Sequence, residues 1–258
     1  MKSREGLLSF LLTKVQEYNT PDFIPHDPIS IPHQFTEKAD IEIAAFLSAT
    51  IAWGNRKSIL KNGNALMALL GHSPHEFVLA YQEKSPAYFQ GFVHRTCNAE
   101  DMHTLILGLH HIYTQYGGME PIFNTYQTED SLQIAITQFK RHFFETLGPS
   151  RTAKHISDPA KGSAAKRINM MLRWLVRKDA NGVDFGIWNS IPMSKLSCPL
   201  DIHSGSVARA LGLLERKQND AKAVEELDAT LRSLAPHDPV QFDFALFGIG
   251  AYGEEYGG

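Results

Sequence analysis

The chain has 258 residues, of which 43% are hydrophobic and 21% are charged, and its formal net charge is −3. These proportions are typical of a globular protein, and the length allows one large domain or two lobes that share a cleft. The two cysteines, Cys97 and Cys198, lie far apart and form no CxxC motif, which excludes a zinc knuckle and a cysteine-ligated iron–sulfur cluster on ligand count. So few cysteines fit a reducing cytoplasm.

Hydrophobic residues recur at helical spacing along most of the chain, and no segment shows the sustained alternation of a strand. The first apolar run is too short to span a membrane and no signal-peptide cleavage site follows it, so we predict an amphipathic helix that packs on the body. We predict an all-α fold, with further helices over residues 40–53, 56–70, 73–81, 98–116, 130–147, 164–176, 201–214, 219–234 and 238–247.

Basic residues concentrate before the longest break in this helical pattern, which covers residues 179–198. Residues 151–178 contain eight Lys or Arg and one acidic residue, Asp158. A local basic stripe on an acidic protein indicates a discrete anion site. A solvated helix face with ion pairs would give the same pattern, so charge alone leaves both interpretations open.

Two residues near predicted helix starts are candidates for chemistry. Asp201 follows Pro199 and precedes a helix, so it is either an N-cap or a carboxylate that faces a cleft. Lys166 begins the last basic helix, with Ser163 as its expected cap and Gly162 allowing a phosphate to approach free amides. A lysine in the first turn opposes the helix dipole, which suggests a function, although most lysines are surface residues.

Two motifs flank the break. The helix Lys166-Arg-Ile-Asn-Met-Met-Leu-Arg-Trp-Leu175 precedes it, and Pro199-Leu-Asp-Ile-His203 follows it. Together they resemble the catalytic segment of the helix-hairpin-helix superfamily of DNA glycosylases, which includes endonuclease III and the 8-oxoguanine glycosylases. Asp238 to Gly250 is similar to the closing helix of that superfamily, and Ala45 to Trp53 is similar to an early helix. The chain also resembles a bacterial family for which no substrate is established.

The resemblance implies roles for individual residues. Asp201 matches the aspartate that stabilises the oxocarbenium-like charge on the deoxyribose or activates the nucleophile. Lys166 matches the lysine that attacks C1′ and forms a Schiff base in bifunctional members. A neighbouring cation such as Arg167, in a desolvated pocket, would favour the neutral amine that this attack requires. His203 matches a histidine near the phosphate of the target nucleotide.

Further contacts with DNA follow from the same resemblance. The loop that contains Trp53, Asn55 and Arg56 would fill the gap that an extruded base leaves in the duplex. We also expect DNA contacts from Lys161, Gly162, Ser163, Arg167 and Arg173.

The hairpin before Lys166 departs from the superfamily pattern. Members usually have Leu-Pro-Gly-Val-Gly there, whereas this segment offers one glycine, Gly162. The interval from Lys166 to Asp201 is longer than in most members and closer to that of the archaeal 8-oxoguanine glycosylases, which have an atypical hairpin and no iron–sulfur cluster. Lys161 is therefore an alternative nucleophile.

Histidines offer a weaker candidate site. His103 and His110 share one face of a predicted helix, but two metal ligands need partners, and no carboxylate cluster is obvious nearby. The chain has no Walker loop and no GxGxxG, GxSxG or HExxH motif. We expect no metal and no cofactor.

These observations predict a two-lobed, all-α glycosylase fold, with residues 36–198 in one lobe and residues 1–35 and 199–258 in the other. The expected function is removal of a damaged base, such as an oxidised purine, from double-stranded DNA, with or without AP-lyase activity. We expect a cytoplasmic, nucleoid-associated monomer with no membrane partner. The alternatives are a non-catalytic DNA-binding protein that retains the fold and a structural or partner-binding helical protein.

Overall fold

The structure is a computed structural model that describes residues 3–81 and 85–252. These residues are all-helical, as predicted, and extended pairing among them is limited to two isolated β-bridges. None of the described helices combines the length and the hydropathy that crossing a membrane requires. The α-helices are α1 (Arg4–Tyr18), α2 (Lys38–Thr50), α3 (Arg56–Leu69), α4 (Pro74–Leu79), α5 (Ala99–Tyr116), α6 (Glu120–Tyr126), α7 (Gln133–Phe144), α8 (Lys166–Val176), α9 (Ile202–Ala210), α10 (Ala221–Leu234) and α11 (Phe242–Tyr252).

Short 3-10 helices occupy several of the connections. They are η1 (Pro21–His26), η2 (Pro28–Ser30), η3 (Pro32–Gln34), η4 (Pro86–Phe89), η5 (Arg151–His155), η6 (Pro159–Lys161), η7 (Met193–Lys195) and η8 (Pro239–Gln241).

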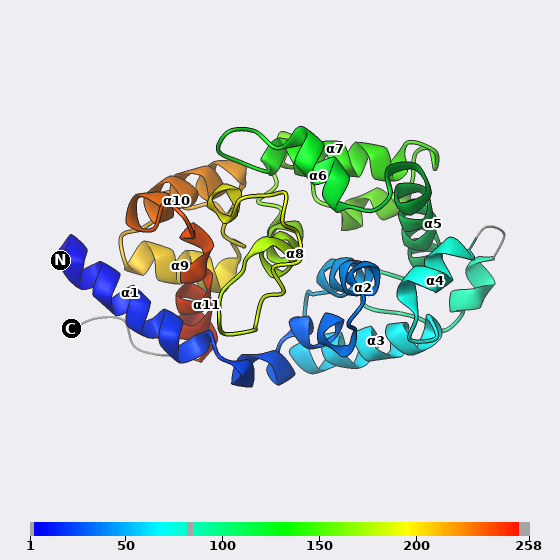
Figure 1. The fold of residues 1–258 in the computed structure, drawn as a ribbon, viewed down its shortest axis with the longest axis horizontal. Coiled ribbons are helices and arrows are strands. Elements are labelled where there is room, and N and C mark those ends of the chain that lie inside the picture. Colours follow the sequence, from blue (N-terminus) through cyan, green and yellow to red (C-terminus); the bar gives the residue numbers. More distant parts are fainter. Residues whose placement is uncertain (1–2, 82–84, 253–258) are drawn as a thin grey trace.

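Two hydrophobic cores lie toward opposite ends of the elongated molecule (Figure 1). The larger core surrounds α2, which is buried from Ile41 to Thr50, and includes residues of α3 to α8. The smaller core joins α1 to α9, α10 and α11. Phe23, Ile29 and Ile31 belong to the larger core, so the cores divide after α1 and not at residue 35, where the sequence suggested a boundary.

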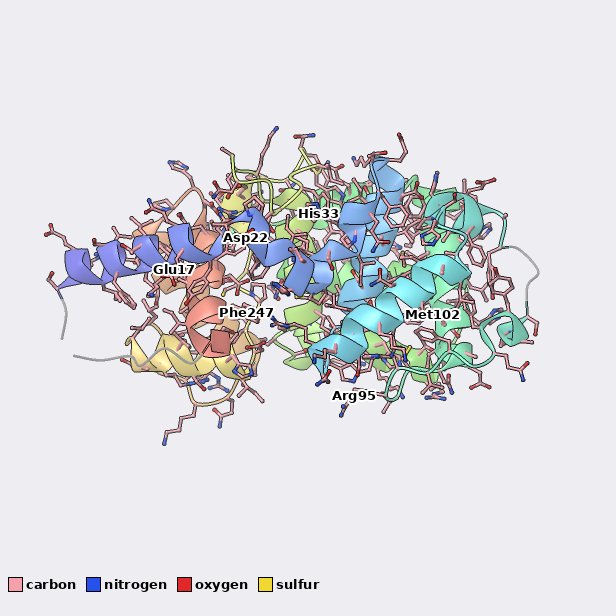
Figure 2. All side chains as sticks on the ribbon, turned by 90° about the horizontal axis from the view of Figure 1, so that it is seen from below. Glu17, Asp22, His33, Arg95, Met102 and Phe247 are labelled. Atoms are coloured by element: carbon pink, nitrogen blue, oxygen red, sulfur yellow. The ribbon has the colours of Figure 1, made fainter. Side chains whose placement is uncertain are left out.

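Two glycines allow close helix contacts in the smaller core. A Cβ atom at Gly248 of α11 would lie 2.2 Å from Cδ2 of Tyr18 on α1. A Cβ atom at Gly250 would lie 3.1 Å from Cβ of His203 on α9. Phe247, which precedes them, lies near the middle of the molecule (Figure 2). The two glycines therefore bring α1 and α9 against α11.

The break over residues 179–198 is irregular but packs along α8. Its backbone amides at Phe185 and Trp188 donate to the carbonyl oxygens of Trp174 (2.8 Å) and Leu175 (2.9 Å). The indole of Trp188 is buried and donates to Glu42 of α2 at 2.9 Å. This segment is therefore a packed part of the larger core, and Figure 1 shows it in yellow between the two groups of helices.

The basic residues near the end of α8 face the interior of the protein. Arg173 is 3% exposed, and its guanidinium pairs with Asp184, at 3.2 Å, and with Asp243 of α11. Arg177 is equally buried and pairs with Asp184, at 3.1 Å, and with Asp238, at 2.9 Å. A buried arginine whose donors are engaged by carboxylates holds the protein together. The guanidinium of Arg173 is thus engaged in an internal ion-pair network, and its predicted contact with DNA stays a prediction.

Candidate functional site

A pocket of about 410 Å³ lies between the two cores. Its lining comes from η1 and η2, from the connection between α2 and α3 and the start of α3, from α8, from the start of α9 and from α11. Lys166 and Asp201 both line it, with the Nζ atom of Lys166 3.7 Å from Oδ2 of Asp201. Each side chain is 26% exposed, so the pair is accessible to a ligand yet partly shielded from water.

Asp201 is the N-cap of α9, as its sequence context predicted. Its Oδ1 accepts a hydrogen bond from the amide of Ser204 at 3.0 Å, and the Ser204 hydroxyl accepts one from the amide of Asp201 at 2.9 Å. This reciprocal capping box fixes the orientation of the carboxylate. Because Oδ1 makes the cap and Oδ2 faces Lys166, capping and a role in the pocket are compatible.

Lys166 begins α8, but Ser163 does not cap this helix. The N-cap is Ala165, which has a left-handed φ of 46° and makes no side-chain capping bond. The hydroxyl of Ser163 instead accepts a hydrogen bond from the amide of Ala165 at 3.1 Å. The Lys166 amine lies near the Met170 sulfur, at 3.7 Å, as well as Asp201.

One short segment, residues 219–221, holds the backbone near both members of this pair. The side-chain amide of Asn219 donates to the carbonyl oxygen of Asp201 at 2.7 Å. The amide of Ala221 donates to the carbonyl oxygen of Gly162 at 3.0 Å, beside the β-bridge between Ser163 and Asp220. The approach to α8 and the start of α9 are thus braced against the same three residues.

Trp53 forms a fixed part of the pocket wall. The guanidinium of Arg167 lies over its ring at 4.7 Å and donates to the carbonyl oxygen of Thr50. The ring of His155 stacks on it at 5.6 Å, and His94 makes an edge contact at 5.1 Å. Burial lowers the pKa of Arg167 to about 10, which leaves it charged at neutral pH. Arg167 therefore supports Trp53 through this contact.

Of the other residues predicted to contact DNA, Arg56 and His203 line the pocket and Asn55 does not. Arg56 lines the pocket, with its guanidinium 5.2 Å from the ring centre of Phe247. His203 also lines it and is exposed. Asn55 is exposed and caps α3 through the amide of Ser58, and it is not part of the pocket lining. The structure thus brings Arg56 and His203 to Lys166 and Asp201.

The hairpin-like residues lie outside this pocket. Lys161 and Gly162 are exposed, and neither belongs to the pocket lining. Gly162 has a φ of 84°, which favours glycine, and a Cβ atom there would meet nothing within 4 Å. Of the two candidate lysines, the geometry places Lys166 beside Asp201 and leaves Lys161 on the surface.

Two buried carboxylates of the pocket lining had no predicted role there. Asp27 caps η2, as expected for an Asp-Pro pair, through the amide of Ile29 at 3.1 Å. Asp243 lies nearby on α11 and pairs with Arg173. Burial raises the pKa of both carboxyls. Local sequence could not place either carboxylate in the pocket, because the pocket is assembled from distant segments.

Residues 27–252 match the model of a family described as protein of unknown function (DUF2400). The chain belongs to this family. The match to DUF2400 includes every residue of the pocket lining except Phe23. Neither the curated proteins nor the solved structures contain a significant match. Because the description of DUF2400 names no activity, the functional argument depends on the geometry of the pocket.

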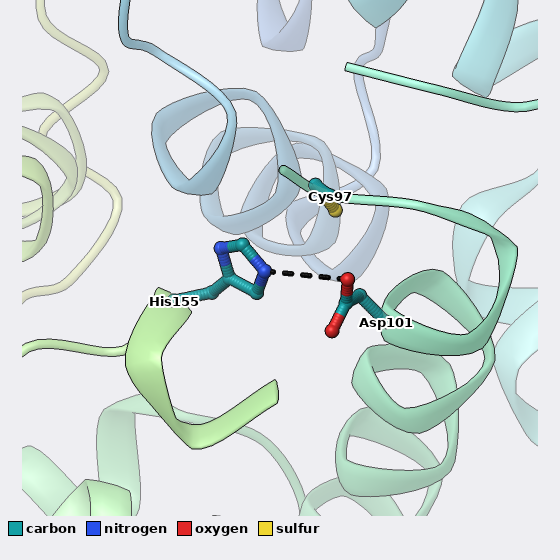
Figure 3. A group of neighbouring side chains, drawn as sticks. All are labelled: Cys97, Asp101 and His155. Atoms are coloured by element: carbon teal, nitrogen blue, oxygen red, sulfur yellow. Dashed lines mark ion pairs between the residues drawn. The ribbon is translucent and has the colours of Figure 1, made fainter. Parts of the chain in front are cut away.

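A second group of side chains in this DUF2400 member lies buried behind Trp53. Cys97, Asp101 and His155 each offer a metal-ligand atom, and these atoms lie within 4.8 Å of one another (Figure 3). Sequence reasoning missed this group because His155 lies more than fifty residues from the local pair of Cys97 and Asp101. The two histidines of the weaker candidate site have other partners, since His103 bonds to the hydroxyl of Tyr81 and His110 to the carbonyl of Val78.

Proposed function

We propose that this protein is a DNA glycosylase that removes a damaged base, such as an oxidised purine, after the base has turned out of the duplex. The observation that carries the proposal is the 3.7 Å separation of Lys166 Nζ and Asp201 Oδ2 in the pocket between the cores. An amine and a carboxylate so placed supply a nucleophile and a group that stabilises positive charge. Cleavage of an N-glycosidic bond through a covalent lysine intermediate uses both.

In the proposed reaction, the neutral amine of Lys166 attacks C1′ of the deoxyribose. A bond from Nζ to C1′ forms as the bond from C1′ to the base breaks, and the electron pair leaves with the base, which takes a proton from solvent. Asp201 Oδ2 stabilises the positive charge that develops on the sugar and accepts the proton that the amine loses. Transfer of this proton to the ring oxygen opens the sugar and leaves a Schiff base between Lys166 and C1′.

The walls of the pocket support a nucleotide as the ligand. Trp53 offers an aromatic surface that Arg167 and His155 hold in place, and stacking of a base on an aromatic ring contributes about 1–3 kcal/mol. Arg56 lines the same pocket and supplies positive charge for a phosphate. Under this proposal the buried carboxyl of Asp27 lies where it would accept hydrogen bonds from a base.

A second candidate function is DNA binding without base excision. The segment before α8 favours it, because Gly162 is the one glycine there and its carbonyl already accepts a hydrogen bond from Ala221. This alternative predicts salt-sensitive DNA binding and no excision of any lesion.

Borohydride trapping separates the two functions. The protein is incubated with duplexes that carry an oxidised purine, an alkylated purine, uracil or an abasic site, and cyanoborohydride reduces any Schiff base to a stable cross-link. We expect a cross-link with wild type, none with Lys166→Ala, and base release lowered on the order of 10²-fold or more in Asp201→Asn.

Lys161→Ala is the matched control, because Lys161 is a nearby surface lysine outside the pocket. It should trap as well as wild type. Trapping that persists in Lys166→Ala and disappears in Lys161→Ala would transfer the nucleophile role to Lys161. Salt-sensitive DNA binding without excision across the panel would favour the non-catalytic alternative.

A further inference from the structure

The buried group behind Trp53 combines three different ligand types in one place. Cys97 and Asp101 are fully buried and His155 is 3% exposed. Their ligand atoms lie within 4.8 Å of one another, and Nε2 of His155 is 3.5 Å from Oδ2 of Asp101 (Figure 3). A thiol, a carboxylate and an imidazole that converge in the interior form a donor set suited to a metal ion.

Local backbone structure fixes the positions of Cys97 and Asp101 without a bound ligand. Cys97 closes a tight turn with His94, whose two reciprocal backbone hydrogen bonds measure 2.8 and 2.9 Å. Asp101 is the N3 residue of a capping box with Asn98 at the start of α5. Cys97 and Asp101 are four residues apart and form a local ligand pair, one on a turn and the other at a helix start. His155 belongs to a distant element, η5. A local pair with a distant third ligand is a common metal-site arrangement.

His155 provides a second, independent indication of a ligand. Its Nε2 atom is buried and makes no hydrogen bond that meets the usual geometry in the described residues, although it lies 3.5 Å from Oδ2 of Asp101. Burying a polar atom without a hydrogen bond is unfavourable, so such an atom in a native protein calls for an explanation. Figure 3 shows the same nitrogen turned toward Asp101, on the side where Cys97 lies. Coordination of a metal ion by Nε2 of His155 would supply the missing partner.

We propose that Cys97, Asp101 and His155 bind a zinc ion. Zinc accepts sulfur, nitrogen and carboxylate oxygen in one site, whereas calcium and magnesium prefer all-oxygen ligands. Three protein ligands leave one position of the tetrahedron for water. The proposal is independent of the glycosylase activity, because it concerns a group that is separate from the pocket lining.

Arg151 is the existing partner of Asp101 with which zinc would compete. Its guanidinium lies 3.1 Å from Oδ2 of Asp101, and its side chain is 48% exposed. An ion pair with so exposed an arginine is weak, so a divalent cation held by three ligands would displace it. The second carboxylate oxygen accepts a hydrogen bond from Thr152 at 2.9 Å, which would orient Asp101 toward the metal.

The proposed ion would also order the wall of the pocket. The ring of His155 stacks on Trp53 at 5.6 Å, with the two planes at 25°. Fixing His155 from behind would limit the rotation of the indole that lines the pocket. The zinc would therefore act on the pocket indirectly, through an aromatic contact.

The experiment uses the full chain, zinc and cobalt. The protein is treated with a chelator and desalted, zinc binding is measured by competition with a chromophoric chelator, and the bound metal is confirmed by elemental analysis. Cobalt then replaces zinc, because a cysteine thiolate bound to cobalt gives a near-ultraviolet charge-transfer band. We expect one zinc ion per chain and this band in the cobalt form.

The variant Cys198→Ser makes the assignment specific. It leaves Cys97 as the sole cysteine of the chain, so any thiolate–cobalt band that remains must come from Cys97. Cys97→Ser and His155→Gln should each weaken zinc binding by more than the roughly 10- to 100-fold that changes outside the ligand shell cause. Absence of stoichiometric zinc, or loss of the thiolate band in folded Cys198→Ser, would overturn the proposal even if Cys97→Ser does not fold.

Discussion

Lys166 faces the carboxylate oxygen of Asp201 that the helix cap leaves free. In Asp201, therefore, Oδ1 stabilises the helix and Oδ2 is available for the proposed chemistry. Asparagine caps helices about as well as aspartate, so Asp201→Asn should keep the free energy of unfolding within about 0.5 kcal/mol of wild type, while Asp201→Ala should lose about 1 kcal/mol.

Both variants should lose base release in the trapping assay, because neither presents a charge at Oδ2. Urea unfolding followed by circular dichroism supplies the stability comparison. An Asp201→Asn protein that is stable and retains excision would remove Asp201 from the proposed chemistry and leave it as a cap.

The internal ion-pair network around Arg173 should be one of the most sensitive points of the fold. Arg173→Ala leaves the buried carboxylates of Asp184 and Asp243 without this partner, which typically costs about 3–5 kcal/mol. Arg141→Ala, at an exposed arginine on α7, should change stability by less than about 0.5 kcal/mol. Similar unfolding midpoints for the two variants would contradict the internal role of Arg173.

Arg167 should control the mobility of Trp53. Arg167→Ala removes the contact with the indole and the hydrogen bond to Thr50, and we expect a loss of about 1–3 kcal/mol. Acrylamide quenching of tryptophan fluorescence should also increase. Trp174 and Trp188 are 0% and 1% exposed, so a change in quenching reports mainly on Trp53. Unchanged quenching in a folded variant would mean that the other contacts of Trp53 are sufficient.

Asp228 should make stability depend on pH. Burial raises its pKa from 3.8 to about 6, against the opposing effect of hydrogen bonds from Ser197 and Cys198. The folded state therefore binds more protons than the unfolded state between about pH 4 and pH 6, and stability falls as the pH rises through this window. The loss from this group is complete above the folded pKa and amounts to about 3 kcal/mol at most.

Asp228→Asn should remove this contribution, since an amide oxygen still accepts the hydrogen bond that the amide of Cys198 donates at 2.9 Å. The test compares unfolding free energies of wild type and variant at several pH values between 4 and 7. The difference between the two proteins should grow in favour of the variant with rising pH. A constant difference would show that Asp228 titrates alike in the folded and unfolded states.

Local features of this site were predictable from the sequence. The position of Asp201 as an N-cap followed from Pro199 before it and an apolar helix after it, and the structure confirms it. The all-helical fold followed from hydrophobic spacing, which reports how each helix buries one face. Both inferences depend on residues within one or two turns of each other.

The basic stripe was harder to interpret because its partners are distant in the sequence. Arg177 pairs with Asp238, 61 residues away, and Arg173 pairs with Asp243, 70 residues away. Counting charges within a segment cannot reveal such pairs. The same reason hid the group of Cys97, Asp101 and His155, whose third member comes from a separate 3-10 helix.

The shared brace at residues 219–221 has a consequence for how this family can vary. The chain runs from α8 to Asp201 through the packed segment 179–198, but hydrogen bonds to Asn219 and Ala221 set the backbone positions near Lys166 and Asp201. Insertions or deletions among the exposed residues of that segment, 180–182, can therefore be absorbed without changing the distance between amine and carboxylate. A one-residue change between Asn219 and Ala221 would disturb both anchors at once. Relatives should therefore vary in length at residues 180–182 of the segment 179–198 but keep a constant length between Asn219 and Ala221.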